Sequence, residues 1–172
     1  YFNNVRVPKE NVLGRPGDGF KISMQALDMG RIGIAAQALG IGMAAYEAAA
    51  RYAAGRRQFG RPIGSFQGVA FKLAEMKTGL DAARFLIYRA AHLKDRGLPY
   101  SVESAMCKRY ASSVAMDVCR EALQVFGGYG YVKDLPVERY FRDAKITEIY
   151  EGTSEVMNII IGNAIMKEFE RM

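Results

Sequence analysis

The chain has 172 residues, half of them hydrophobic, which is enough for one domain with its own core and excludes a disordered segment. The net charge of +6 does not by itself predict a nucleic-acid partner, because basic residues are interspersed with acidic ones and no nucleic-acid-binding motif accompanies them. No apolar run approaches the length of a membrane span and no signal peptide opens the chain, so we expect neither a membrane segment nor secretion.

Residues 1–16 differ from the rest of the chain. Val5-Arg6-Val7-Pro8 alternates apolar and polar positions, and Asn, Pro and Gly interrupt the segment. We interpret residues 1–16 as a short extended segment, the final strand and linker of a preceding β domain. Residues 17–172 are predicted to form a C-terminal helical bundle domain.

Apolar residues spaced three and four positions apart predict helices in the remainder of the chain. Gly55 and Gly127-Gly128 suit helix ends, and Ser101 and Thr153 suit N-caps. The predicted helices span approximately residues 18–52, 65–97, 101–127, 136–144 and 153–169. Long helices joined by short turns pack side by side, so the fold class is all-α, an antiparallel domain resembling a four-helix bundle.

The cysteines and the histidine exclude several kinds of site. Cys107 and Cys119 are the only cysteines and lie twelve positions apart in a predicted helix, so we expect no disulfide and no metal site. His92 is the only histidine, so histidine triads and multi-histidine metal centres are not expected either.

A carboxylate precedes the last predicted helix. In Tyr150-Glu151-Gly152-Thr153, Glu151 lies on an exposed turn at the mouth of that helix, where a catalytic base could be placed. The spacing alone favours a solvated loop carboxylate, because most loop glutamates are solvated. Glu148 is a competing base candidate, although it belongs to the preceding turn and suits a structural role.

Three further segments have both a functional and a structural interpretation. The arginines and Phe59 of residues 56–61 could hold a phosphate and a ring, or they could complement a helix end with Phe59 folded inward. The glycine-rich residues 124–130 follow a helix rather than a strand, which favours a helix cap over a dinucleotide fingerprint. Asp28 and Arg31 could form a local ion pair, with Gly30 making room for a neighbouring helix or a ligand.

Taken together, the motifs resemble a known family. In order they read Leu-Asp-Met-Gly-Arg-Ile-Gly-Ile-Ala, Arg-Arg-Gln-Phe-Gly-Arg-Pro-Ile, Phe-Gln-Gly-Val-Ala-Phe-Lys-Leu-Ala-Glu-Met, Gln-Val-Phe-Gly-Gly-Tyr-Gly-Tyr, Arg-Asp-Ala-Lys-Ile and Ile-Tyr-Glu-Gly-Thr-Ser-Glu. The series resembles the C-terminal helical domain of the acyl-CoA dehydrogenases, and it is most similar to the short-chain, butyryl-CoA type. The resemblance covers essentially the whole chain.

The resemblance implies α,β-dehydrogenation of an acyl-CoA thioester to a trans-2-enoyl-CoA, with FAD as hydride acceptor. Glu151 matches the family's proton-abstracting base, and its backbone N–H would bind the thioester carbonyl together with a flavin ribityl hydroxyl. Some relatives carry the base at the position of Gly30, and glycine cannot serve there. Relatives that oxidise nitroalkanes have aspartate at position 151, so glutamate favours thioester chemistry.

The resemblance also implies binding residues. Those implied for the acyl-CoA substrate are Asp28, Met29, Gly30, Arg31 and Gly152. Those implied for FAD, several of them reaching the cofactor of a neighbouring subunit, are Arg56, Gln58, Phe59, Gln67, Gln124, Val125, Phe126, Gly127, Gly128, Thr153, Ser154 and Glu155. One departure is Met157-Asn158, where most relatives have Gln-Arg, which puts some subunit or cofactor contacts in doubt.

The family further implies a homo-oligomer, dimer or tetramer, with electron-transferring flavoprotein as acceptor of the electrons. The location would be cytoplasmic in a bacterium or the mitochondrial matrix in a eukaryote. Since the N-terminal helical domain and most of the β domain are absent, we expect the chain alone to be inactive. The alternatives are a helical oligomerisation module without activity and an acyl-CoA oxidase of the same fold.

Overall fold

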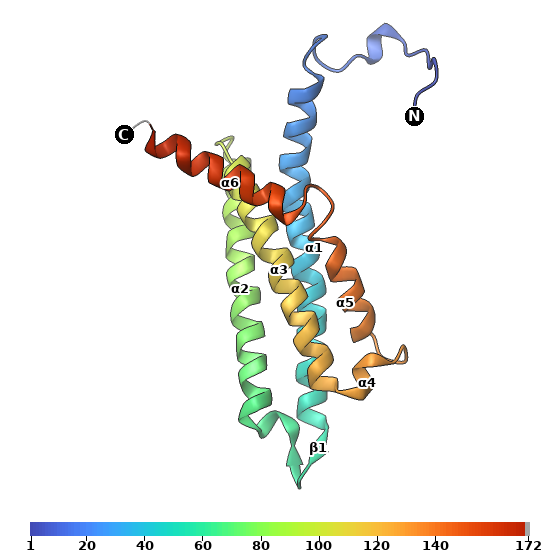
Figure 1. The fold of residues 1–172 in the computed structure, drawn as a ribbon, viewed down its shortest axis with the longest axis vertical. Coiled ribbons are helices and arrows are strands. Elements are labelled where there is room, and N and C mark those ends of the chain that lie inside the picture. The colour runs from blue at the N-terminus through green and yellow to red at the C-terminus, as the bar shows by residue number, and fades with distance from the viewer. Residues whose placement is uncertain (171–172) are drawn as a thin grey trace.

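The computed structural model describes residues 1–170, and it confirms the all-α fold class (Figure 1). Its helices are the 3₁₀ turns η1 (Lys9–Asn11) and η2 (Ile63–Ser65) and the α-helices α1 (Gly19–Gly55), α2 (Gln67–Asp95), α3 (Ser101–Phe126), α4 (Gly128–Tyr131), α5 (Val137–Ile146) and α6 (Ser154–Phe169). The strands β1 (Arg57–Gln58) and β2 (Arg61–Pro62) form a small antiparallel hairpin between α1 and α2.

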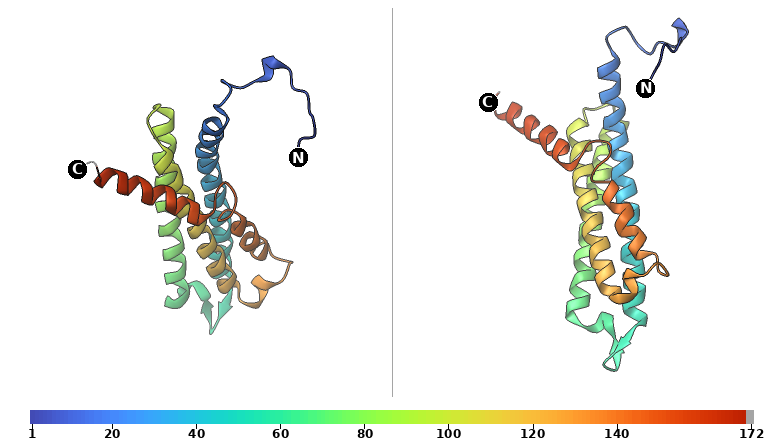
Figure 2. Two further views of the ribbon diagram at one scale, coloured as in Figure 1. Left: turned by 45° about the horizontal axis from the view of Figure 1, so that its top comes forward. Right: turned by 45° about the vertical axis from the view of Figure 1, so that its right-hand side comes forward.

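The three long helices lie side by side and α5 packs against α1 and α3 (Figures 1 and 2). The chain reverses at the hairpin and again before Ser101, so α2 is antiparallel to α1 and α3, whereas α1 and α3 run parallel to each other. Helix α6 crosses α3 and extends away from the bundle, with Met157 as its one buried residue. The loop between α5 and α6 therefore lies against the side of the bundle rather than at its tip.

Small residues let α1 approach its neighbours closely. The buried face of α1 consists mainly of alanines: Ala35, Ala38, Ala45, Ala49 and Ala53. At Gly42, a Cβ atom would lie 2.8 Å from Leu80 Cδ2 on α2 and 3.4 Å from the backbone of Ala115 on α3. Gly42 thus marks the point where the three long helices meet, and no larger residue fits there without displacing a neighbour.

Two expectations about local structure need correction, and two further features were not predicted. Residues 1–16 contain no strand, only η1, because a terminal segment with no partner strand cannot satisfy a sheet ladder. Ser101 is the first helical residue rather than the N-cap, and the cap position falls on Tyr100 without a side-chain hydrogen bond. The hairpin β1–β2 and the single turn α4 were not predicted.

The membrane expectation also changes. Among the described residues, α1 is long and apolar enough to cross a membrane by length and composition, so the expectation that no run approaches that length is wrong. Part of its apolar character comes from the residues that it packs against α2, α3 and α5, and 28% of its most apolar window is buried. Composition alone does not separate such a central bundle helix from a membrane span.

The packing at Gly42 predicts a stability difference. We expect Gly42→Val to lower the free energy of unfolding by about 1–3 kcal/mol, because the side chain would overpack the junction of three helices. Gly40 faces open space on the same helix. Gly40→Val should leave the free energy of unfolding unchanged or slightly higher, because valine is the better helix former. Urea denaturation of both variants measures the difference, and equal effects would contradict this account of the packing.

Candidate active site

The residues singled out from the sequence fall into two groups that lie far apart along α1. The first group surrounds Glu151, beside Gly30 on α1. The second group lies at the hairpin that follows the end of α1. Residues 30–55 of α1 separate them, and a helix of that length rises roughly 40 Å. One chain therefore presents two distinct surfaces, not one continuous site.

The loop that carries Glu151 is held in place at both ends. After α5, the buried Thr147 hydroxyl donates to the Ala144 carbonyl at 2.7 Å, which closes the last turn of that helix. At the other end, the Thr153 side chain caps α6 by accepting from the Val156 N–H, so the predicted N-cap is confirmed. Within the loop, the Tyr150 hydroxyl donates to Gln37 Oε1 of α1 at 2.6 Å.

Two successive residues of this loop have left-handed backbone conformations. Glu151 has φ of +56° and Gly152 has φ of +95°. Glycine adopts such angles freely, whereas for glutamate they are uncommon and persist where surrounding contacts enforce them. A Cβ atom at Gly152 would lie 2.7 Å from Met157 Cε, so a side chain there would have to displace the end of Met157.

The Glu151 carboxylate lies directly against Gly30. A Cβ atom at position 30 would be 2.5 Å from Glu151 Oε2 and 3.0 Å from its Cδ. Gly30 therefore makes room for Glu151, and not for a neighbouring helix. Oε2 is buried and has no hydrogen-bond partner among the described residues. Buried polar atoms are nearly always paired, so an unpaired carboxylate oxygen is a feature that needs a functional explanation.

Two buried cations hold the backbone on either side of this bend. Arg31 of α1 donates from Nε to the Glu151 carbonyl at 3.5 Å, and its guanidinium pairs with Asp28 at 2.6 Å. The local ion pair expected from the sequence is therefore present. Lys108 of α3 donates from Nζ to the Gly152 carbonyl at 2.7 Å. Of the predicted substrate residues, Met29 alone is exposed, next to this cluster.

The start of α6 forms a second hollow beside the loop. It has a volume of about 400 Å³, and its lining includes Thr153, Ser154, Glu155 and Arg109. Ser154 Oγ and Arg109 Nε are buried there without hydrogen-bond partners among the described residues. The backbone N–H of Glu155 itself and the Thr153 hydroxyl hold the pKa of the Glu155 carboxyl below its ordinary value. The hollow thus offers unsatisfied donors beside an ionised carboxylate.

The second group is built around the tip of the hairpin. Phe59 has φ of +50° and its side chain is 91% exposed, so the interpretation in which it folds inward is wrong. Its ring meets only the edge of Phe66, at 6.1 Å between centroids. Arg56, Gln58 and Gln67 are also exposed. An exposed aromatic ring among arginines is a surface that a planar anionic ligand fits.

The glycine turn after α3 lies at the same end of the bundle. Gln124, Gly127 and Gly128 are exposed, and Gly127 has φ of +61°, which agrees with the predicted helix stop. Val125 and Phe126 are core residues, and Phe126 stacks on Tyr52 at 4.2 Å. Any contact of these two residues with a ligand would therefore use the backbone, not the side chains.

Lys108 was not recognised from the sequence as a residue of this site. Its position continues the buried face of α3, with Ser104 four residues before and Ser112 four residues after, all fully buried. A lysine in an otherwise buried helical stripe was the available signal, since lysine is almost never fully buried without a partner. Gln37 and Arg109 gave no comparable signal.

The cysteines and the possible metal ligands do not form a further site. Burial raises the pKa of Cys107 and of Cys119 to about 12, so neither thiol is a nucleophile near neutral pH. Within residues 1–170, no cluster of three or more His, Cys, Asp or Glu side chains could hold a metal ion.

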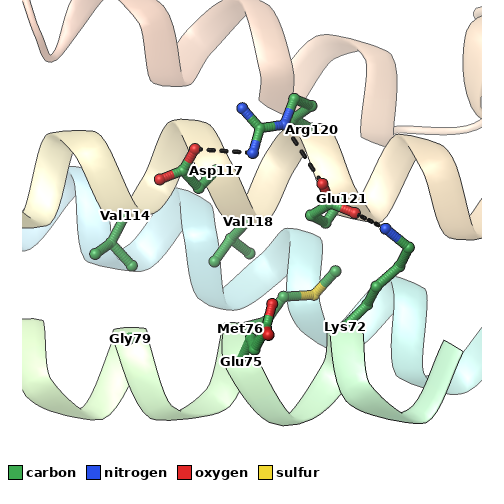
Figure 3. A pocket seen from close by; sticks show the side chains of 9 residues that line it. All are labelled: Lys72, Glu75, Met76, Gly79, Val114, Asp117, Val118, Arg120 and Glu121. Atoms are coloured by element: carbon green, nitrogen blue, oxygen red, sulfur yellow. Dashed lines mark hydrogen bonds and ion pairs between the residues drawn. The ribbon is translucent and has the colours of Figure 1, made fainter. Parts of the chain in front are cut away.

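A groove between α2 and α3 contains none of the predicted site residues (Figure 3). Its charged side chains are largely paired: Lys72 bonds to Glu121, which also meets Arg120, and Arg120 pairs with Asp117 at 3.1 Å. This pairing fits a helix–helix seam rather than a ligand site.

Comparison with known proteins agrees with this geometry. Residues 17–166 match the family described as "Acyl-CoA dehydrogenase, C-terminal domain". The mitochondrial short-chain specific acyl-CoA dehydrogenase of Rattus norvegicus is 52% identical over 98% of this chain and 41% of its own length.

Two solved structures are similarly close. The butyryl-CoA dehydrogenase of Megasphaera elsdenii superposes with a TM-score of 0.95 at 55% identity, over 96% of this chain and 43% of that one. A chain in a structure described as the electron transferring flavoprotein of Acidaminococcus fermentans gives 0.94 at 56% identity, over 95% and 43%. This chain thus spans less than half the length of these relatives, and it belongs to the acyl-CoA dehydrogenase family, whose C-terminal helical domain it forms.

Proposed function

We propose that this chain is the C-terminal domain of an FAD-dependent acyl-CoA dehydrogenase that converts a short-chain acyl-CoA to the trans-2-enoyl-CoA. The single observation that carries the proposal is the Glu151 carboxylate, whose buried Oε2 has no partner and lies against the bare Cα of Gly30. A base that must take a proton from carbon benefits from a lone pair that no hydrogen bond occupies. The two short-chain relatives support the substrate class.

In this proposal Glu151 removes the α-proton of the thioester. The C–H electrons form the α,β double bond as the β-hydrogen departs as hydride, and the proton stays on the carboxylate. An α C–H is a poor acid, so the thioester carbonyl must be polarised at the same moment. The backbone N–H of Glu151 is the donor assigned to this task, and it belongs to the same left-handed turn as the carboxylate.

Members of this family are flavoproteins, and the residues present fit FAD. When bound, the flavin accepts the hydride. Near Glu151, the unpaired Ser154 hydroxyl and the hollow at the start of α6 suit the flavin end of the cofactor. The exposed Phe59 and the arginines of the hairpin suit a ring and a diphosphate.

The distance between the two groups supports an oligomer. Roughly 40 Å of helix separates Gly30 from the hairpin, so both groups cannot contact the same end of one cofactor. The hairpin residues Arg56, Gln58 and Phe59, with Gln67 and the turn 124–128, would instead serve the FAD bound to a second copy of the chain. This arrangement requires a homo-oligomer, a dimer or a tetramer.

We propose electron-transferring flavoprotein as the partner that reoxidises the full-length enzyme, in line with one of the matched structures. Bacterial and mitochondrial relatives exist, so the proposed location is the bacterial cytoplasm or the mitochondrial matrix.

The assignment of the base predicts a large effect at one glutamate and a small effect at its neighbour. In the full-length enzyme, Glu151→Gln should lower kcat for butyryl-CoA roughly 10²–10⁴-fold with FAD retained, because the amide has the same shape but cannot accept the proton. Glu148 is the matched control, because its side chain pairs with Lys145 at 2.7 Å. Glu148→Gln should keep near-normal kcat, and the reverse pattern would move the base to Glu148.

The contact at Gly30 predicts that a single methyl group disturbs the base. Gly30→Ala places a Cβ atom where Glu151 Oε2 now lies, so we expect kcat to fall roughly 10²-fold through misplacement of the carboxylate. Gly33 lies one turn further along α1, and a Cβ atom there meets nothing within 4 Å. Gly33→Ala should therefore leave kcat unchanged, and steady-state kinetics on both variants tests the contact.

The chain alone should fold without being an enzyme. It has its own core, but it holds only one wall of the proposed flavin pocket, so we expect a helical circular dichroism spectrum with little bound flavin. Gel filtration with added FAD, followed by absorbance at the flavin band, measures retention. Stoichiometric FAD together with butyryl-CoA oxidation by the 172-residue chain would show that no further domain is needed.

A further inference from the structure

The Lys108 ammonium is the most unusual buried charge in the described part of the chain. Its side chain is completely buried in the middle of α3. Its one hydrogen bond donates from Nζ to the Gly152 carbonyl at 2.7 Å. No carboxylate of residues 1–170 lies within ion-pairing distance of it, unlike the other buried cation, Arg31, which has Asp28. The buried ammonium is thus compensated by only one hydrogen bond, to a neutral main-chain oxygen.

Such an arrangement is a poor way to stabilise a fold. Removing an ammonium from water costs several kcal/mol, and a bond to a neutral carbonyl returns only part of that cost. Burial accordingly lowers the pKa of Lys108 from its ordinary value, against the more distant carboxylates of Glu148 and Glu155 that favour the charged form. Arg31 and Arg109 act in the same direction as burial. Replacing such a charge by an apolar side chain of similar size is often neutral or stabilising.

The hydrogen bond from Lys108 does, however, hold the backbone of the residue that directly follows Glu151. Gly152 follows Glu151 directly, and both residues are in the left-handed region. Arg31 of α1 holds the Glu151 carbonyl at 3.5 Å, and Lys108 of α3 holds the next carbonyl along the chain. Two rigid helices therefore fix two consecutive peptide planes, and the side chain and N–H of Glu151 project from this fixed bend.

We propose that Lys108 is a positioning residue for the catalytic loop: its hydrogen bond to the Gly152 carbonyl holds the left-handed bend that aims the Glu151 carboxylate and N–H. The inference rests on the proposed function, since it concerns the base of that reaction. Lys108 does not touch the substrate in this account. It acts through the backbone of the residue after the base, so its loss should slow proton abstraction without weakening acyl-CoA binding.

The test uses the full-length FAD-loaded enzyme and the variant Lys108→Met, whose unbranched apolar side chain is one atom shorter than lysine and lacks both the charge and the donor. Per bound FAD, we expect kcat for butyryl-CoA to fall about 10- to 100-fold with KM nearly unchanged, the cost of a misplaced base. The isotope effect with α-deuterated butyryl-CoA should rise, because proton abstraction becomes rate-limiting. Thermal stability should be unchanged or higher, which a structural lysine would not give.

Two further variants keep the test decisive. Lys108→Gln retains an N–H donor but is one atom shorter, so kcat should lie between Lys108→Met and wild type, with the isotope effect still raised. If Lys108→Met does not fold, unchanged kcat and isotope effect in Lys108→Gln overturn the proposal. Ser112→Ala is the control, because this buried hydroxyl on the same helix bonds only to carbonyls of α3. It should change neither quantity.

Amide hydrogen exchange in residues 149–153 of the holoenzyme gives a readout that does not depend on turnover. Exchange there should be faster in Lys108→Met than in wild type or Ser112→Ala. Wild-type kcat, isotope effect and exchange in Lys108→Met would overturn the positioning role and leave the assignment of Glu151 intact. A wild-type enzyme that does not oxidise acyl-CoA, or a fully active Glu151→Gln, would instead overturn the proposed function itself.

Discussion

The contact between the Glu151 carboxylate and the bare Cα of Gly30 is the constraint on which the site depends. It joins residues 121 positions apart in the sequence, and it exists only because α1, α3 and α5 are packed closely enough to bring the loop onto the face of α1. The alanine-rich face of α1 allows this close packing. Because residue 30 has no side chain, the Glu151 carboxylate can occupy the space beside its Cα.

The same rigidity keeps the two candidate surfaces apart. An uninterrupted helix of 37 residues carries Gly30 near one end and delivers the hairpin at the other. Because a helix rises 1.5 Å per residue, its length sets the separation between the base and the Phe59 tip. Under the proposed function, a cofactor that uses both kinds of contact would lie between two copies of the chain. A shorter or broken α1 would change the separation between the two groups and with it the geometry of the proposed oligomer.

Much of the helical architecture follows from the sequence, and the site follows only in part. The period of three and four residues predicted the long helices, and Thr153 was recognised as a cap because its hydroxyl needs only local geometry. The hairpin was missed because two-residue strands leave no period to detect. Phe59 could not be placed from sequence, since an aromatic residue beside arginines suits a buried plug and an exposed tip equally well.

The site itself required tertiary structure. From its spacing Glu151 was better explained as a solvated loop carboxylate than as a base. The feature that favours a base is a carboxylate oxygen that is buried without a partner. That fact arises from the approach of α1 and from the bend at Gly152, neither of which is local. Family resemblance named the residue, but it said nothing of Lys108, because a lysine in a buried stripe has no motif of its own.

The loop also shows how the domain balances stability against function. A glutamate with positive φ, an unpaired carboxylate oxygen and a fully buried ammonium each cost free energy, and all three lie within a few residues of one another in space. Away from this bend, the hydrophobic core of the long helices consists mainly of small and aliphatic residues. Concentrating unfavourable groups at one bend is tolerable only when the surrounding core is this regular. A substitution that relaxes the bend should therefore raise the free energy of unfolding and lower kcat at the same time. Relief of strain that does not position the base would raise stability without lowering kcat.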